Sequence, residues 1–148
     1  GRVVAMDIRS MGLYDYEQVS ALMQGTPGVS LRSADSRDAI SRYLERNPNL
    51  SFVAEVDNRI VGCVFGGHDG RRGYLYHLVV EAESRRHGIG RDLVFRALEG
   101  LAAEGIEKVH IDVFTDNADA IAFWKRLGWE LRGDLHRFSF IRSFDRNA

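Results

Sequence analysis

The chain has 148 residues, of which 45% are hydrophobic and 28% are charged. This length and composition are typical of one globular domain and exclude a disordered or collagen-like chain. Lys and Arg number 20 against 21 Asp and Glu, so the formal net charge is −1. Proteins that bind nucleic acid or membrane surfaces usually carry an excess of positive charge, so we expect neither partner.

Cysteine and histidine usage argues against common metal and redox sites. Cys63 is the only cysteine, which excludes an internal disulfide and a cysteine-built zinc site. The five histidines are scattered without ligand spacing, and we expect no bound metal. No apolar run approaches the ~20 residues that cross a bilayer. These features together predict a protein of a reducing compartment, the cytoplasm.

Hydrophobic periodicity and turn residues predict alternating helices and strands. In chain order, we expect a strand at Val3–Arg9, helices at Leu13–Gln24 and Asp35–Arg46, strands at Ser51–Val56, Arg59–Gly66 and Tyr74–Glu81, a helix at Arg91–Glu104, a strand at Lys108–Phe114, a helix from Asn117 to Leu127, and strands at Trp129–Leu131 and Leu135–Arg142. Asp57-Asn58 is a two-residue hairpin signal between two of these strands. The order βααβββαβαββ predicts one α/β domain over residues 1–148, with a mixed central sheet flanked by about four helices.

The most informative segment runs from Leu78 to Arg91, from a predicted strand through a loop into a helix. Gly88 and Gly90 carry no Cβ, so the backbone there can approach a ligand closely. The first N–H groups of the helix lack partners and lie at the positive end of its dipole. Positive charge comes from Arg85, Arg86 and Arg91. The loop therefore predicts a phosphate or pyrophosphate site, with a simple tight turn as the alternative.

Two common nucleotide-binding patterns do not fit this loop. The dinucleotide fingerprint needs a third glycine where Leu93 stands. The P-loop needs Lys followed by Ser or Thr where the chain has Arg91-Asp92.

The pattern Arg85-x-x-Gly88-x-Gly90, between a strand and an amphipathic helix, resembles the Q/R-x-x-G-x-G/A acetyl-CoA motif of the GNAT superfamily of N-acetyltransferases. The stretch from Asn117 to Trp129 resembles the family's N-x-x-A-I-x-x-Y-x-x-x-G-F segment, and the spacing between the two stretches also matches. The similar region extends from Phe52 to Trp129. Within this superfamily, the chain also resembles the ribosomal-protein (RimI-like) acetyltransferases. The resemblance implies a GNAT fold with acetyl-CoA as co-substrate.

The resemblance also implies which residues contact the cofactor. In the family the strand before the loop splays from its neighbour, so its backbone groups would pair with the pantetheine arm, and the loop amides would hold the pyrophosphate. Asn117 matches a family position near the pantetheine arm, although it can equally cap the following helix. The expected cofactor-binding residues are Leu78, Val79, Val80, Arg85, Arg86, His87, Gly88, Ile89, Gly90, Arg91 and Asn117.

Acetyl transfer needs a base or a water relay, because nearly all amines are protonated at pH 7. Asp112 lies where the RimI-like group has a strand with a catalytic Glu, and partial burial would raise its pKa toward neutrality. Asp112 is therefore the first candidate for the catalytic base, against a purely structural role at the end of the sheet. His68, Asp69 and His77 are reserve candidates. Cys63 lies in an apolar run and is expected in the core, which disfavours a covalent route.

Trp124 departs from the family pattern, which usually has a tyrosine there to protonate the coenzyme thiolate. An indole N–H is a donor but not a usable acid, so that role is not transferred. Tyr74, Tyr76 or solvent could protonate the thiolate instead, or it could leave unprotonated.

Two functions follow from the resemblance. The first is acetyl transfer from acetyl-CoA to a primary amine of a small molecule or protein, by direct attack in a ternary complex. The alternative is a GNAT-fold sensor that binds acyl-CoA with little or no transfer. The sequence does not encode the identity of the amine, and a homodimer is compatible with either function.

Overall fold

The structure is a computed structural model that describes residues 5–148. The chain forms two compact units, one ending at Ile111 and the other running from Asp112 to Ala148. The first predicted strand lies partly outside the described residues, because Val3 and Val4 precede them. The assignment of residues 1–148 to one domain stays a prediction.

The α/β fold class predicted from the sequence is confirmed, with a five-stranded mixed sheet and four helices. The elements are β1 (Met6–Ser10), α1 (Tyr16–Gln24), α2 (Arg37–Arg46), β2 (Phe52–Val56), β3 (Arg59–His68), β4 (Gly73–Val80), α3 (Ile89–Ala103), β5 (Val109–Ile111) and α4 (Ala118–Arg126). Three short 3₁₀ turns precede α1, α2 and α3, namely η1 (Leu13–Asp15), η2 (Ser33–Asp35) and η3 (Ala82–Ser84).

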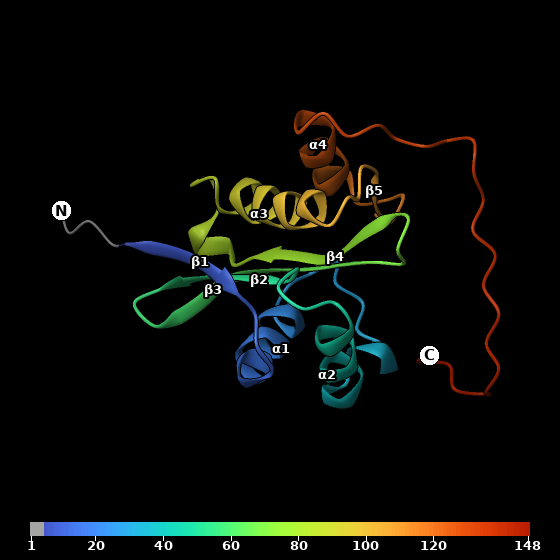
Figure 1. The fold of residues 1–148 in the computed structure, drawn as a ribbon, viewed down its shortest axis with the longest axis horizontal. Coiled ribbons are helices and arrows are strands. Elements are labelled where there is room, and N and C mark those ends of the chain that lie inside the picture. The colour runs from blue at the N-terminus through green and yellow to red at the C-terminus, as the bar shows by residue number, and fades with distance from the viewer. Residues whose placement is uncertain (1–4) are drawn as a thin grey trace. The chain divides into compact units, whose positions relative to one another are not determined.

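The sheet has the strand order β1-β2-β3-β4-β5. Neighbouring strands are antiparallel except β4 and β5, which run parallel. The hairpin between β2 and β3 is confirmed, since Asp57 and Asn58 have the positive φ angles of 50° and 61° that a tight two-residue turn requires. Helices α1 and α2 cover one face of the sheet and α3 covers the other (Figure 1).

The two helical layers give the sheet a core on each face. Helices α1 and α2 contribute Val19, Met23 and Ile40 to a hydrophobic cluster that includes Cys63 and Phe65 of β3. On α3 the fully buried residues are Leu93, Ala97 and Leu101, and this helix packs on β3 and β4. Strands β3 and β4 are therefore held from both sides.

Strand β4 is irregular at its middle. Cys63 pairs with Val79 and Phe65 pairs with Tyr76, so the two residues between Tyr76 and Val79 form a bulge. His77, one of these two, has φ of 50°, which non-glycine residues seldom adopt. Strand β5 pairs only with Gly73–Leu75. Among residues 5–148, the edge of β4 that faces away from β3 has no strand partner from Tyr76 to Val80.

The last two predicted strands, Trp129–Leu131 and Leu135–Arg142, are wrong. Residues 129–148 contain neither helix nor strand. The apolar side chains that suggested a strand are exposed to solvent, and the exposed fraction is 95% for Phe138 and 83% for Phe140. Alternating apolar residues mark a face that could be buried, but a strand also needs a hydrogen-bonding neighbour, and no described strand pairs with this segment.

Candidate active site

The open edge of β4 presents backbone donors at strand spacing. The N–H of Glu81 donates to the carbonyl of Val61 on β3 at 2.9 Å. Because backbone N–H groups alternate in direction along a strand, the amides of Leu78 and Val80 point to the open edge, and that of Val79 points toward β3. An extended ligand could therefore add to this edge as a further strand would.

The loop that opens α3 contains a run of unpaired amides. Within residues 5–148, none of the backbone N–H groups from Arg86 to Arg91 donates to a backbone carbonyl. Gly88 is the N-cap of α3 and has φ of 75°, in the left-handed region where glycine is favoured. These amides lie at the positive end of a 15-residue helix, which is the arrangement that binds phosphate groups in many proteins.

Side chains at the end of β4 hold this loop in place. Glu81 accepts from Arg59 at 2.6 Å and from the hydroxyl of Ser84 at 2.8 Å. The bond from Arg59 lowers the pKa of Glu81, so the carboxylate stays charged. Arg85 donates through Nε to the carbonyl of Val80 at 3.1 Å, which ties the start of the loop to the last residue of the strand.

Asp112 and Asn117 belong to the second unit and have local partners there. The side chain of Asp112 is 60% exposed and lies 2.5 Å from the guanidinium of Arg137. The expected partial burial of Asp112 is therefore wrong, and its role as the base stays a prediction without that support. The side chain of Asn117 accepts from the N–H of Ala120 at 3.1 Å, which confirms that Asn117 caps α4. Its contact with the cofactor stays a prediction.

Trp124 is buried, with 7% of its surface exposed. Its ring meets those of Phe123 and Trp129 edge to face, at centroid distances of 5.1 and 4.6 Å. Aromatic packing thus accounts for an indole where the family usually has a phenol.

Both ring nitrogens of His68 are engaged. Nδ1 accepts from the N–H of Gly70 at 3.0 Å, and Nε2 lies 3.1 Å from a carboxylate oxygen of Glu104. A neutral ring with its proton on Nε2 satisfies both contacts. Asp69 accepts from the amides of Arg72 and Arg71 at 2.8 Å each, and these bonds lower its pKa. Of the three reserve candidates, Asp69 is therefore a weakened base, and His68 has protein partners on both ring nitrogens.

His77 forms a close pair with Asp35, with 2.7 Å between Nε2 and Oδ1. Burial acts to raise the pKa of Asp35, but the hydrogen bonds from His77 and from the amide of Arg32 outweigh it and lower the pKa below its usual value. The pair fixes the side chain of the bulged residue to the turn before α2. Sequence reasoning missed Asp35, because nothing in the spacing links two residues 42 positions apart.

Cys63 lies in the core, as expected from the sequence. It is completely buried, and Sγ is 3.6 Å from the carbonyl oxygen of His77. Burial raises the pKa of the thiol to about 12, so the nucleophilic thiolate is suppressed.

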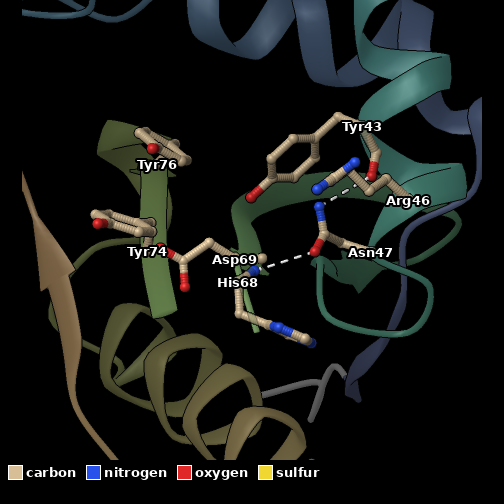
Figure 2. Close-up of a pocket in the computed structure, with 8 residues that line it drawn as sticks. Tyr43, Arg46, Asn47, His68, Asp69, Tyr74 and Tyr76 are labelled. Atoms are coloured by element: carbon tan, nitrogen blue, oxygen red, sulfur yellow. Dashed lines mark hydrogen bonds between the residues drawn. The ribbon is translucent and has the colours of Figure 1, made fainter. Parts of the chain in front are cut away.

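A cavity of about 220 Å³ lies between α2 and the adjoining ends of β3 and β4 (Figure 2). Tyr43 and Arg46 come from α2, and Tyr74 and Tyr76 face them from β4 (Figure 2). Tyr76 is also the first residue of the open edge of β4, so the cavity adjoins the end of that edge. No sequence motif predicts the lining of this cavity, because it depends on how α2 packs beside the sheet. Among residues 5–148, no group of three or more His, Cys, Asp or Glu side chains could hold a metal ion, and no helix is long and apolar enough to cross a membrane.

The site thus consists of a mixed sheet whose fourth strand has a bulge and an open edge, followed by a loop of unpaired amides, and the class of protein is an acetyltransferase of the GNAT type, as the following match shows. The profile described as "Acetyltransferase (GNAT) family" matches residues 16–129. The chain belongs to the GNAT family.

Relatives and solved structures support the same assignment. The chain is 37% identical to acetyltransferase ECA0875 of Pectobacterium atrosepticum, over 84% of this chain and 88% of that protein. It is also 37% identical to acetyltransferase plu1384 of Photorhabdus laumondii, over 93% and 94% of the two chains. The crystal structure of Ard1 from Thermoplasma volcanium is similar with a TM-score of 0.77 and 25% identity, over 87% and 85% of the chains. The aminoglycoside N-acetyltransferase AAC(6')-Iy in complex with CoA has the same fold, with a TM-score of 0.72, 22% identity and 97% of each chain covered.

Proposed function

We propose that this acetyltransferase uses acetyl-CoA as co-substrate and acetylates a primary amine of a small molecule or protein. The observation that carries the proposal is the run of unpaired amides from Arg86 to Arg91, next to the open edge of β4. The amides bind the pyrophosphate of the coenzyme, and the edge binds its pantetheine arm. The solved CoA complex with the same fold supports this cofactor.

The open edge supplies the polarising group for the reaction. The N–H of Leu78 or Val80 donates to the thioester oxygen, which gains negative charge as the amine nitrogen attacks the carbonyl carbon. The C–N bond forms, the C–S bond breaks, and the electron pair leaves on the coenzyme sulfur. A thiolate of ordinary pKa, about 8.5, needs little help to leave, so no acid is required at the position of Trp124.

The amine is an ammonium group at neutral pH and must first lose a proton, and its nitrogen loses a second proton, to the base or to water, as the amide forms. Asp112 is the candidate base, directly or through water. The carboxylate of Asp112 is exposed and paired with Arg137. A water relay without a dedicated side chain is the simplest alternative.

Two measurements on the purified chain test the proposal. The melting temperature with and without acetyl-CoA reports cofactor binding, and release of free CoA thiol with a panel of primary amines reports transfer. We expect a shift in melting temperature and amine-dependent thiol. A shift without any amine-dependent thiol would instead identify the protein as a sensor of acyl-CoA, and no shift at all would contradict both functions.

Gly88→Val locates the cofactor site. A side chain at Gly88 would be strained by the positive φ, and its Cβ would lie 3.1 Å from the guanidinium of Arg91, on the side where phosphate must approach. We expect acetyl-CoA to bind at least about tenfold more weakly, or ~1.4 kcal/mol. Gly105→Val is the matched control, since Gly105 has φ of 82° and open space around it. The control should lower stability similarly and leave the affinity unchanged. Equal affinities for the two variants would mean that the loop does not hold the cofactor.

A further inference from the structure

The cavity between α2 and β4 contains groups whose hydrogen bonds are already made. Asn47 accepts from the amide of His68 at 3.0 Å and donates to the carbonyl of Tyr43 at 3.4 Å. His68 uses both ring nitrogens, on Gly70 and Glu104. The carboxylate of Asp69 accepts from two backbone amides. The acceptors around the cavity are therefore largely occupied by the protein itself.

Two donors in the same cavity are unused. The hydroxyl of Tyr43 is buried and has no hydrogen-bond partner among residues 5–148. Burial and the neighbouring Tyr76 raise the pKa of Tyr43, so the phenol keeps its proton and remains a donor. Arg46, the last residue of α2, is exposed and lines the cavity, and its guanidinium makes neither an ion pair nor a hydrogen bond to a described residue. In Figure 2 the two side chains lie together on the α2 side of the cavity.

The position of the Tyr43 hydroxyl depends on a glycine in β3. A Cβ on Gly67 would come within 2.6 Å of this oxygen and 2.8 Å of the side-chain amide of Asn47. The backbone thus makes room for a buried hydroxyl that nothing in the described chain satisfies. Buried polar groups nearly always have a partner, so an unsatisfied donor beside an unpaired cation points to a missing anionic acceptor.

Tyrosine rings form the opposite wall of the cavity. Tyr74 and Tyr76 stack at a centroid distance of 6.3 Å, and Tyr43 meets Tyr76 edge to face at 6.2 Å. These rings give the cavity flat, largely apolar sides. A volume of about 220 Å³ is below the ~300–1,000 Å³ of most ligand sites, so the cavity fits a small molecule or one end of a larger one.

We propose that the acceptor is a small primary amine that carries a carboxylate, as amino acids do, and that Arg46 and the Tyr43 hydroxyl bind this carboxylate. The amine then points past Tyr76 toward the open edge of β4, where the proposed thioester lies. This inference rests on the proposed acetyl transfer and adds the class of acceptor to it.

Matched acceptors test the inference. We would measure kcat/KM for the common L-amino acids and for the corresponding amines without the carboxylate, for example phenylalanine with phenethylamine. At least one amino acid should exceed its decarboxylated partner by about tenfold or more, or ~1.4 kcal/mol. Equal or lower rates for all amino acids would overturn the inference, as would acetylation of plain amines alone.

Variants of the two donors locate the effect. Arg46→Gln and Tyr43→Phe should each reduce kcat/KM for the preferred amino acid by about tenfold and leave the decarboxylated amine within about twofold. Arg42→Gln, one helical turn before Arg46, removes a cation that is also exposed but does not line the cavity, so it is the control and should change neither rate. Tyr43→Phe should also keep or raise the melting temperature, because it removes an unsatisfied buried hydroxyl. Full activity of Arg46→Gln and Tyr43→Phe on the amino acid would overturn the inference.

Thermal protection by acetyl-CoA distinguishes a failure of the inferred acceptor class from a failure of the proposed acetyl transfer. Acetyl-CoA should protect the wild type and both variants equally against thermal unfolding. If it protects none of them, or if no amine is acetylated, acetyl transfer itself is contradicted. If it protects them and amines are acetylated without preference for a carboxylate, only the acceptor class is wrong.

Discussion

The part of the chain up to Ile111 and the part from Asp112 onward differ in what their polar groups contact. In the first part, the amides from Arg86 to Arg91 and the hydroxyl of Tyr43 have no partner among the described residues. In the second part, the residues predicted to act on the cofactor or substrate have partners within that same part. Asp112 pairs with Arg137, and Asn117 caps its own helix.

This difference separates features that need a ligand from features that the fold explains alone. Every helix begins with unpaired N–H groups, but here the run starts three residues before α3 and adjoins the open edge of β4, and this combination supports a bound anion. An exposed ion pair, a helix cap and an aromatic contact are common in proteins without any ligand. The unpaired donors of the first part therefore support the proposed cofactor site, whereas the contacts of the second part do not require a ligand.

Replacing Asp112 gives the largest expected effect on rate. If Asp112 is the base, Asp112→Asn should lower kcat/KM by about 10²–10⁴ and abolish the acidic limb of the pH–rate profile. Rates across pH 5–9 with saturating acetyl-CoA provide the measurement. Arg137→Gln is the companion variant, since it removes the partner of the carboxylate and leaves Asp112 in place. If Asp112→Asn is fully active and keeps the acidic limb of the pH–rate profile, Asp112 is not the base. The result would then favour the water relay.

Trp124→Ala tests whether the second part is stabilised by its aromatic cluster. Removing a buried Trp side chain costs about 3–5 kcal/mol of unfolding free energy. The contacts of Trp124 with Phe123 and Trp129 predict a loss in this range. Denaturant unfolding followed by Trp fluorescence and by circular dichroism would measure it. Phe138→Ala is the control, because that ring is 95% exposed, and we expect a change within about 0.5 kcal/mol.

Sequence patterns predicted the first part well because its elements carry local signals. The turn at Asp57-Asn58 and the glycine loop before α3 depend on residues that favour particular backbone angles, and both are found. The bulge at His77 was not predicted. Non-glycine residues seldom adopt a positive φ, so the sequence around His77 does not predict one, and the angle accompanies the shifted pairing between β3 and β4.

The C-terminal segment shows where pattern reading fails. Leu135, Phe138 and Phe140 suggest a strand, yet the segment has no strand partner in the described chain. Local sequence specifies which side chains prefer burial, whereas pairing depends on the position of a neighbouring strand. The cavity between α2 and β4 was missed for the same reason, since Tyr43 and Tyr76 meet only in the folded chain.

The partly buried His77–Asp35 pair predicts a pH dependence of stability. The pKa of Asp35 is lower in the folded chain than the value of about 3.9 in an unfolded chain. The unfolded state therefore binds more protons near pH 4, so the contribution is complete above about pH 5 and is lost as the pH falls through the folded pKa.

Asp35→Asn should accordingly cost about 1.5–3 kcal/mol of unfolding free energy at pH 6–7, the range for a hydrogen bond to a charged group. The difference from wild type should shrink as the pH falls below about 4. Asp112→Asn, which breaks an exposed pair, should change stability by at most about 1 kcal/mol. Chemical denaturation between pH 3 and 7 would measure both. A pH-independent cost for Asp35→Asn would show that its charge does not stabilise the fold.

The smallest expected effect is on the rate of the conservative Trp124 variants. If attack by the amine limits turnover, Trp124→Phe and Trp124→Tyr should both leave kcat about unchanged, because the thiolate leaves without an acid. If protonation of the thiolate limits turnover, Trp124→Tyr should raise kcat by restoring the phenol that the family usually has. Melting curves must accompany both rates, since Trp124 packs between two aromatic rings and either variant can lower stability. We expect the first outcome. A folded Trp124→Phe enzyme whose kcat falls a hundredfold, or ~2.7 kcal/mol, would give the indole a direct chemical role and remove the distinction between the two parts of the chain.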